Sequence, residues 1–231
     1  MVVAILTVTD SEDQTLKPEL IVFDLDGTLV RFPHDYILGV TERIISEMSI
    51  PEVARSVLQQ QFAKFDLFGA VATEHRRELS ARLSSALHWS LYPGLEPFPN
   101  TYECLKVLSE NGYRLGLATS RDTPHEELNR ELEQHRLLDF LQIVEVRTCA
   151  KSEWFDKGPQ LQKISKHSGV PLDRMLVVGD TPTDISSAKK VGVKLTAALH
   201  SGGTNPEVLS QEGPNWQCSD LEELVSCLLA L

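Results

Sequence analysis

Residues 19–28 read Glu-Leu-Ile-Val-Phe-Asp-Leu-Asp-Gly-Thr, and this segment joins a strong structural signal to a strong chemical one. Leu20–Phe23 is short, apolar and partly β-branched, and Gly27 follows it, which is typical of a strand buried on both faces of a parallel sheet. Asp24 and Asp26 stand at the end of this expected strand, where two residues one position apart point to the same side. Aspartate also starts turns, but a turn does not need Asp24 inside an apolar run. Two like charges are costly to bury without a cation or donors, so the pair predicts a functional site.

After Pro93-Gly94 the sequence alternates between amphipathic helices and apolar strands. Such alternation implies a parallel sheet with right-handed crossovers, and ligands bind at the carboxyl ends of its strands. The expected helices are Thr101–Asn111, Pro124–His135, Pro159–His167, Pro182–Val191, Glu207–Gln211 and Asp220–Leu229, and the expected strands are Tyr113–Ala118, Leu141–Val146, Met175–Val178 and Val193–Leu199.

Residues 33–92 have a different texture, with helical patterns and no strand signal. Their charges nearly balance, so the rest of the chain carries almost all of the net charge of −11. We therefore expect a helical domain at 33–92, inserted between two parts of one α/β domain at 1–32 and 93–231. Its expected helices are Tyr36–Met48, Pro51–Phe65 and Val71–Leu91.

A second acidic group occurs in Gly179-Asp180-Thr181-Pro182-Thr183-Asp184. Asp180 ends an expected strand and Asp184 lies one helical turn further on, so both can face one point. A helix cap before Pro182 explains one of these carboxylates but not the other. Together with Asp24 and Asp26, they place four acids at two strand ends, and an all-oxygen set of this kind suits Mg²⁺.

Two weaker signals accompany the acids. Thr119 and Ser120 follow an expected strand, where hydroxyl and backbone N–H groups can hold phosphate oxygens. The same residue types are equally common as helix caps. Lys157 precedes an expected helix, and a lone lysine is by default a solvated surface charge.

Composition limits the classes of partner. With 22 Lys and Arg against 33 Asp and Glu, the chain is unsuited to nucleic acid or to an anionic membrane. The apolar run Met1–Val8 has no positive flank and is too short to span a bilayer, so we expect a strand or a disordered start. The four cysteines form no Cys-x-x-Cys pair, which argues against a disulfide framework or zinc site and favours a reducing, cytoplasmic location.

Taken in order, FDLDGT at 23–28, Thr119, Lys157 and GDTPTD at 179–184 resemble the four motifs of the haloacid dehalogenase-like hydrolase superfamily. The resemblance implies a Rossmann-like, three-layer α/β/α core around a central parallel sheet. It also implies that residues 33–92 form a small, all-helical cap of the first type, as in phosphoglycolate phosphatase-like members.

The resemblance implies a role for each motif residue. Asp24 would be the nucleophile that forms an aspartyl-phosphate, and Asp26 would be the general acid and base. Covalent catalysis of this kind splits one hard displacement into two easier ones. Thr119, with Ser120 beside it, would bind the transferring phosphoryl group. Lys157 would neutralise charge on Asp24 and the phosphate.

The same resemblance implies a Mg²⁺ site. Asp24, Asp180 and the backbone carbonyl of Asp26 would ligate the ion, and Asp184 would support it directly or through water. Dehalogenase and phosphonatase members lack an acid at the position of Asp26, so its presence favours phosphate monoester hydrolysis or phosphomutase chemistry.

Two positions depart from the family pattern. Arg31-Phe32 stands where capped members usually have Asp-Ser. Lys157-Gly158-Pro159 replaces the usual Lys-Pro, which leaves Lys151 as an alternative lysine. We prefer Lys157 because it directly precedes a helix start.

The sequence thus predicts a Mg²⁺-dependent phosphatase acting on a small phosphorylated metabolite such as phosphoglycolate or a sugar phosphate, as a monomer or homodimer. Arg31, His34 and Arg121 are the candidates for contacts that select the substrate. A phosphomutase of the β-phosphoglucomutase kind is the alternative from the same family. A non-catalytic regulator that binds phosphorylated ligands is the alternative from another class, but such members typically lose an aspartate that this chain keeps.

Overall fold

The computed structural model describes residues 17–86, 94–147 and 156–231. The chain forms two compact units: one contains the described residues up to Arg31 and those from Leu95 to Leu231, and the other is Phe32–Gly94. The apolar run Met1–Val8 and the alternative lysine Lys151 lie outside the described residues. Within the described ranges, no helix combines the length and apolar character that a membrane span requires.

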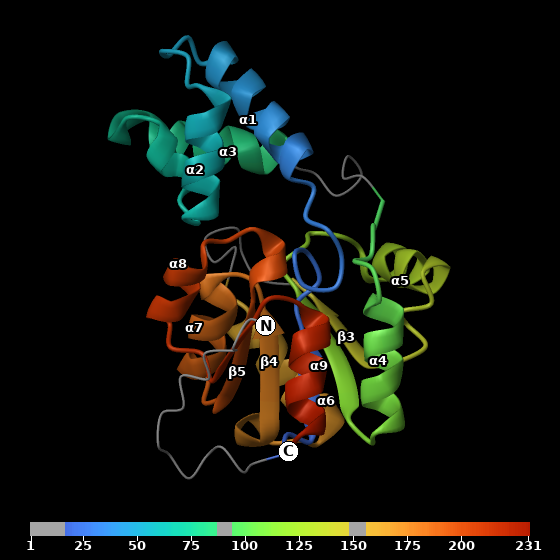
Figure 1. Cartoon of the computed structure of the whole chain (residues 1–231). Helices are drawn as coiled ribbons and strands as arrows, with labels where there is room; N and C mark the ends of the chain where they lie inside the picture. Colours follow the sequence, from blue (N-terminus) through green and yellow to red (C-terminus); the bar gives the residue numbers. More distant parts are fainter. Residues whose placement is uncertain (1–16, 87–93, 148–155) are drawn as a thin grey trace. The chain divides into compact units, whose positions relative to one another are not determined.

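A six-stranded sheet, parallel throughout, forms the centre of the first unit (Figure 1). The strand order is β3-β2-β1-β4-β5-β6. The chain therefore builds outward from β1 through β2 to β3, and then returns to the other side of β1 for β4. The strands are β1 Leu20–Phe23, β2 Arg114–Thr119, β3 Leu141–Val146, β4 Met175–Gly179, β5 Leu195–Leu199 and β6 Trp216–Cys218.

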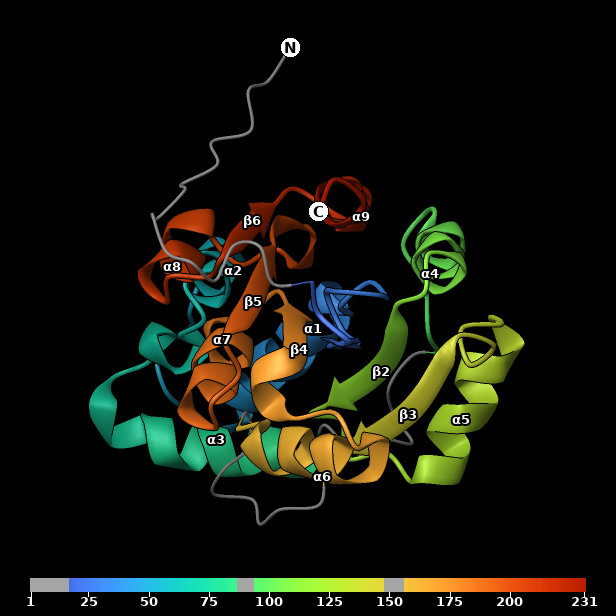
Figure 2. The same ribbon diagram turned by 90° about the horizontal axis from the view of Figure 1, so that it is seen from below.

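Helices cover both faces of this sheet, so the unit has three layers (Figure 2). Side chains of α4, α5 and α9 pack on one face, and those of α6 and α7 pack on the other. This arrangement confirms the predicted α/β class with a parallel central sheet. The helical segments are α4 Thr101–Glu110, α5 His125–Gln134, α6 Gly158–Ser168, η5 Leu172–Arg174, α7 Pro182–Lys190, η6 His200–Gly202, α8 Pro206–Gln211 and α9 Leu221–Leu229.

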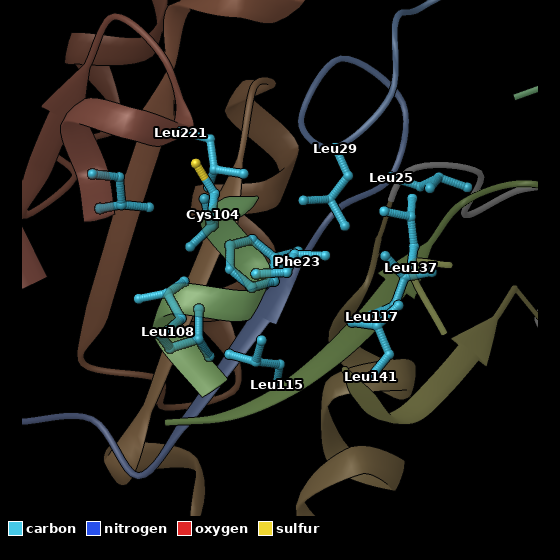
Figure 3. Close-up of a cluster of buried hydrophobic side chains, with 14 of the residues drawn as sticks. Phe23, Leu25, Leu29, Cys104, Leu108, Leu115, Leu117, Leu137, Leu141 and Leu221 are labelled. Atoms are coloured by element: carbon cyan, nitrogen blue, oxygen red, sulfur yellow. The ribbon is translucent and has the colours of Figure 1, made fainter. Parts of the chain in front are cut away.

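The pleat of β1 divides its side chains between the two cores. Ile21 and Phe23 belong to the core under α4 and α9, whereas Leu20 and Val22 belong to the core under α6. This alternation is the period of two that an extended strand imposes. Figure 3 shows Phe23 in the first core, with Leu108 of α4 nearby. β1 is buried on both faces, so packing on each side fixes the position of its carboxyl end. The polar residues of the first motif follow directly after that end.

The second unit is helical and has a core of its own. It contains α1 His34–Glu47, α2 Arg55–Ala63, the short 3₁₀ helix η2 Leu67–Ala70 and α3 Thr73–Ala86. Leu38, Ile45, Leu58 and Leu79 are buried together between these helices. The insert is helical as expected; the end of the expected helix Val71–Leu91 falls outside the described residues.

One expected helix begins later than predicted, and two elements of the structure were not expected. The helix expected from Pro51 begins at Arg55 instead, where Arg55 forms ion pairs with Asp35 and Glu42 of α1. The sequence analysis did not predict η2 or β6. With three residues, β6 is too short to show a period, and its pairing with β5 defines it.

Candidate active site

The strand order places the two acidic motifs next to each other. β1 and β4 are neighbours in register, with Phe23 opposite Val178. The ladder continues past the end of β1, because the backbone N–H of Asp24 donates to the carbonyl of Val178 over 2.8 Å. The carboxyl ends of these strands flank the point where the chain reverses direction across the sheet, which is where α/β sheets bind ligands.

Three buried carboxylates meet at this point. Asp24 follows β1, Asp180 follows β4, and Asp184 lies in the first turn of α7. One oxygen from each lies within 4.8 Å of the others. Among the described residues, this set could hold a metal ion, and it consists of three of the four aspartates that the sequence singled out.

Asp184 is tied down more tightly than its neighbours. Its Oδ2 accepts hydrogen bonds from the backbone N–H of Thr181 (3.0 Å) and from the Thr181 hydroxyl (2.7 Å). Thr181 and Asp184 therefore form a capping box at the start of α7. The sequence interpretation gave Asp184 no capping role, whereas the structure shows that it caps α7 and also lies in the carboxylate cluster.

Lys157 joins two of the carboxylates. Its Nζ lies 2.5 Å from Oδ1 of Asp24 and 2.5 Å from Oδ1 of Asp184. The side chain is buried, at the position that caps α6. Burial alone would lower the pKa of Lys157, but the carboxylates of Asp184 and Asp24 outweigh it, so the pKa is raised and the ammonium stays charged. The default interpretation of Lys157 as a surface charge is therefore wrong.

The electrostatic balance of the cluster fits a divalent cation. Burial raises the pKa of Asp24 to about 7, although Lys157 opposes the shift. Burial and then the charge of Asp24 raise the pKa of Asp180 well above its ordinary value. Three carboxylates face one ammonium, so a positive charge is missing, and oxygen ligands suit a hard ion such as Mg²⁺.

Glycines enclose the carboxylates so closely that a side chain would collide with them. A Cβ atom on Gly27 would lie 2.2 Å from Oδ2 of Asp180, and one on Gly202 would lie 1.9 Å from the same oxygen. Gly27 also has a φ of +86°, which favours glycine. Thr28 donates its hydroxyl hydrogen to Oδ1 of Asp180 over 3.1 Å.

Gly202 is the last residue of η6, the short 3₁₀ helix after β5, and no residue of this segment was among the predicted site residues, although its place at a strand end indicated that it could border the site. The neighbouring Ser201 donates its hydroxyl hydrogen to the carbonyl of Gly27 over 3.2 Å. The available signal was the run Ser201–Asn205 at the end of an expected strand. Its contact with Asp180 depends on β5 lying beside β4, which the sequence alone does not give.

Asp26 has a separate environment. Its side chain is outside the three-carboxylate cluster, and both of its oxygens accept from Arg121: Oδ2 from Nε and Oδ1 from Nη2, each over 2.6 Å. The structure places the guanidinium of Arg121, a predicted specificity residue, on the carboxylate of Asp26. Its role toward the substrate stays a prediction.

Thr119 and Ser120 lie at the end of β2, the strand on the other side of β1. Thr119 is buried, and its hydroxyl accepts a hydrogen bond from the backbone N–H of Arg121 over 3.2 Å. Its own hydroxyl hydrogen can still be donated to a ligand. Ser120 is half-buried in the segment that follows β2.

The other two specificity candidates have partners elsewhere. The guanidinium of Arg31 pairs with Glu96 (3.1 Å) and lies over the ring of Phe98. His34 belongs to the helical unit, where its ring packs edge-on against Phe32 and Phe62 at centroid distances of 5.0 Å.

The fold and site define an α/β protein with a carboxylate and lysine centre at the reversal point of its sheet. The chain belongs to the haloacid dehalogenase-like hydrolase family, whose sequence profile matches residues 21–198. The predicted family and the predicted class of enzyme are thereby confirmed.

Individual relatives agree with this placement. The phosphoglycolate phosphatase of Rhodospirillum rubrum is 29% identical, over 82% of this chain and 83% of that protein. The phosphoglycolate phosphatase of Aliivibrio fischeri is 27% identical, over 91% of this chain and 96% of that protein. A haloacid dehalogenase-like hydrolase from Streptococcus pneumoniae shares the fold, with a TM-score of 0.69 at 17% identity over 91% of this chain and 98% of that one.

Proposed function

We propose that this protein is a Mg²⁺-dependent phosphatase that hydrolyses a small phosphate monoester through an aspartyl-phosphate on Asp24. The observation that carries the proposal is the buried set of three aspartates at the ends of β1 and β4, two of which, Asp24 and Asp184, contact Lys157. Phosphoglycolate is the first substrate to test, because the relatives that match this chain over most of its length carry that name.

Asp24 is the best-suited nucleophile among the three. Asp184 is engaged by Thr181 and Lys157, and Asp180 is confined by Thr28 and two glycines. In the described part of the chain, Lys157 is the one side chain that hydrogen-bonds Asp24. A carboxylate with one partner can present its other oxygen to a phosphorus atom.

The reaction then balances in two steps. In the first, an oxygen of Asp24 attacks phosphorus, the bond from phosphorus to the ester oxygen breaks, and that oxygen takes a proton from the Asp26 carboxyl to leave as an alcohol. In the second, a water attacks the phosphorus of the aspartyl-phosphate and gives a proton to the Asp26 carboxylate. The bond between phosphorus and Asp24 breaks, which releases phosphate and restores both aspartates.

The remaining residues hold the phosphoryl group and its charge. Thr119 and Ser120, beside Asp24 at the next strand end, donate to phosphate oxygens. Lys157 stays protonated and attracts the negative charge that accumulates on these oxygens. Asp24 and Asp180 would hold Mg²⁺ with support from Asp184, and the ion would supply positive charge that offsets the repulsion between carboxylates and phosphate.

We also propose that the helical unit Phe32–Gly94 is the cap that its place in the sequence suggests, and that it selects among phosphate esters. This part of the proposal rests on the position of the unit between the first and second motifs. The charge-balanced composition of the segment is compatible with binding an anionic substrate.

The test is phosphate release from phosphoglycolate and a panel of sugar phosphates, with and without Mg²⁺. Asp24→Asn is the active-site variant, and Asp173→Asn is the matched control, because Asp173 is exposed in η5 before the start of β4. We expect Mg²⁺-dependent release that Asp24→Asn abolishes and Asp173→Asn leaves intact. Isomerised sugar phosphate without net release would show a phosphomutase. No turnover of any kind by the folded, Mg²⁺-loaded protein would refute the proposal.

A further inference from the structure

The two aspartates of the first motif have different cationic partners. Asp24 contacts Lys157, whereas Asp26 is held by Arg121 through two hydrogen bonds of 2.6 Å. The side chains of Arg121 and Asp26 are only 6% and 13% exposed. A guanidinium that meets both oxygens of a carboxylate in this way fixes its rotation as well as its position.

Arg121 is itself anchored at two further points. Its backbone N–H donates to the hydroxyl of Thr119, which fixes the start of its side chain beside the expected phosphate site. Its Nη1 faces Oε2 of Glu131 in α5 at 3.7 Å. That oxygen is buried and has no hydrogen-bond partner within the described ranges. Glu131 therefore holds the far side of the guanidinium by charge, while Asp26 takes its two shortest contacts.

We propose that Arg121 is a positioning residue that orients the Asp26 carboxyl for proton exchange with the leaving group, and that Glu131 holds Arg121 in place. The inference rests on the proposed function. An aspartate carboxyl otherwise rotates within a broad range about its last torsion. Proton transfer needs the carboxyl oxygen within hydrogen-bond distance of the leaving oxygen, so fixing the carboxyl raises the rate of the step that uses it.

An alternative role for Arg121 is that of a second positive charge that attracts the phosphate. The two roles predict different dependence on the leaving group. An alkoxide needs a proton in order to leave, whereas 4-nitrophenolate leaves without one. A residue that acts through Asp26 affects alkyl esters selectively, whereas a charge on the phosphate affects both classes equally.

The experiment compares kcat/KM for phosphoglycolate, or the best alkyl phosphate of the panel, with that for 4-nitrophenyl phosphate, in saturating Mg²⁺. This ratio of constants reports the step in which the leaving group departs. For Arg121→Met we expect a loss of about 100-fold on the alkyl ester, at the lower end of general acid contributions, and a loss below about threefold on the aryl ester. Arg121→Lys keeps the charge but not the paired contacts, so we expect it to keep most of the selective loss.

Four further variants complete the test. Asp26→Asn shows the signature of losing the proton donor, and Arg121→Met added to Asp26→Asn is expected to cost little more. Glu131→Gln is expected to give a smaller loss with the same selectivity. Arg130→Met is the matched control, because Arg130 lies on α5, is largely exposed and pairs with Glu127. Thermal melting shows whether each variant is folded. If Arg121→Met is unstable, Arg121→Lys and Glu131→Gln still measure the selective loss on the alkyl ester.

Equal losses on both esters, or full recovery of both by Arg121→Lys, would overturn the inference and leave the proposed function standing. A wild-type protein that releases phosphate from neither ester would overturn both together. The two failures are therefore distinguishable in one set of assays.

Discussion

Asp24 makes the site electrostatically unfavourable in the metal-free protein. Burial raises its pKa to about 7 from an ordinary value of 3.8. Between these two values the folded protein binds more protons at this position than the unfolded chain does. The contribution of Asp24 to the free energy of unfolding therefore falls as the pH rises from about 4 to about 7. The pKa of Asp180 is also raised, so it acts in the same direction.

We predict that, in EDTA, Asp24→Asn melts several degrees above the wild-type protein at about pH 8, and that this difference shrinks toward about pH 5. At low pH the wild-type aspartate is neutral and resembles asparagine. Mg²⁺ is expected to raise the melting temperature of the wild-type protein more than that of the variant, because the variant has lost a ligand. Differential scanning calorimetry across this pH range makes the comparison.

Asp173→Asn serves as the control for this prediction, since the residue is exposed and outside the cluster. Asp156 and Glu223 have lowered pKa values, so their titration changes the free energy of unfolding below about pH 4.5. That range lies outside the pH range of this comparison. A difference between Asp24→Asn and the wild-type protein that stays constant across the pH range would contradict the argument.

We predict that the site requires glycine at position 202 because there is no room for a side chain there. The backbone angles of Gly202 do not require glycine. Its φ is outside the left-handed region, so alanine is allowed by the backbone, but a Cβ would lie 1.9 Å from Oδ2 of Asp180. Gly202→Ala must displace the Asp180 carboxylate or the loop after β5. We expect a loss of about 1–3 kcal/mol in the free energy of unfolding, together with weaker Mg²⁺ binding by calorimetric titration.

Gly39→Ala is the matched control for this substitution. Gly39 lies inside α1, and a Cβ there would meet nothing within 4 Å. Alanine in a helix interior is expected to stabilise the protein by about 0.5–1 kcal/mol. If the two variants have the same stability and the same Mg²⁺ affinity, the packing of Gly202 on Asp180 is not what the site requires.

At the level of helices and strands, local signals predicted more than long-range ones. The strand Leu141–Val146 was predicted with its observed ends, and β4 differs from its prediction by one residue. Residues 141–146 are rich in β-branched side chains, and β4 is an apolar run that ends at Gly179, so both signals are local information. The order of the strands in the sheet is not local information. Only the family resemblance could therefore predict that the ends of β1 and β4 are neighbours.

The same distinction separates the residues of the site. Asp24 and Asp180 were identified from their place at strand ends. The pairing of Asp26 with Arg121 joins residues 95 positions apart, and nothing local to either one indicates it. The sequence predicted a helix cap before Pro182 but did not assign it to Asp184, whereas the structure shows that Asp184 completes the capping box with Thr181. One side chain serves both the start of α7 and the carboxylate cluster.

That dual use leads to a prediction for α7. Thr181→Ala removes the hydroxyl that donates to Oδ2 of Asp184 over 2.7 Å. We expect a loss of about 1 kcal/mol in the free energy of unfolding, as for other N-terminal caps, and a fall of about 3 °C in the melting temperature. We also expect weaker Mg²⁺ binding, because the orientation of Asp184 is loosened.

Ser186→Ala is the comparison variant on the same helix. Ser186 is exposed, and its hydroxyl donates to the carbonyl of Pro182 within its own turn. We expect this variant to match the wild-type protein in stability and in Mg²⁺ affinity. Thermal melts and calorimetric titration measure the stability and the Mg²⁺ affinity of both variants. Equal values for Thr181→Ala and Ser186→Ala would contradict a link between the cap and the site.

The two chain segments that connect the first unit to the helical unit are hydrogen-bonded to each other within the first unit. Arg31 is the last residue before the helical unit, and its backbone N–H donates to the carbonyl of Glu96 over 2.7 Å. Val30 also pairs with Pro97 in an antiparallel bridge. The points where the chain leaves and re-enters the first unit are therefore hydrogen-bonded to each other, and each unit has its own buried core.

We predict that the first unit folds when Phe32–Gly94 is replaced by a flexible linker of about four residues, within the length of natural hairpin loops. The residues of the carboxylate cluster all belong to this unit, so Mg²⁺ should still raise its melting temperature. It should also keep hydrolysis of 4-nitrophenyl phosphate that Asp24→Asn abolishes. Its kcat/KM values across the panel of phosphate esters should converge, because the helical unit that we propose as the source of selectivity is missing. If the shortened protein folds but ranks the esters as the full chain does, selectivity resides in the first unit. If it does not fold with Mg²⁺ present, the two cores depend on each other for stability.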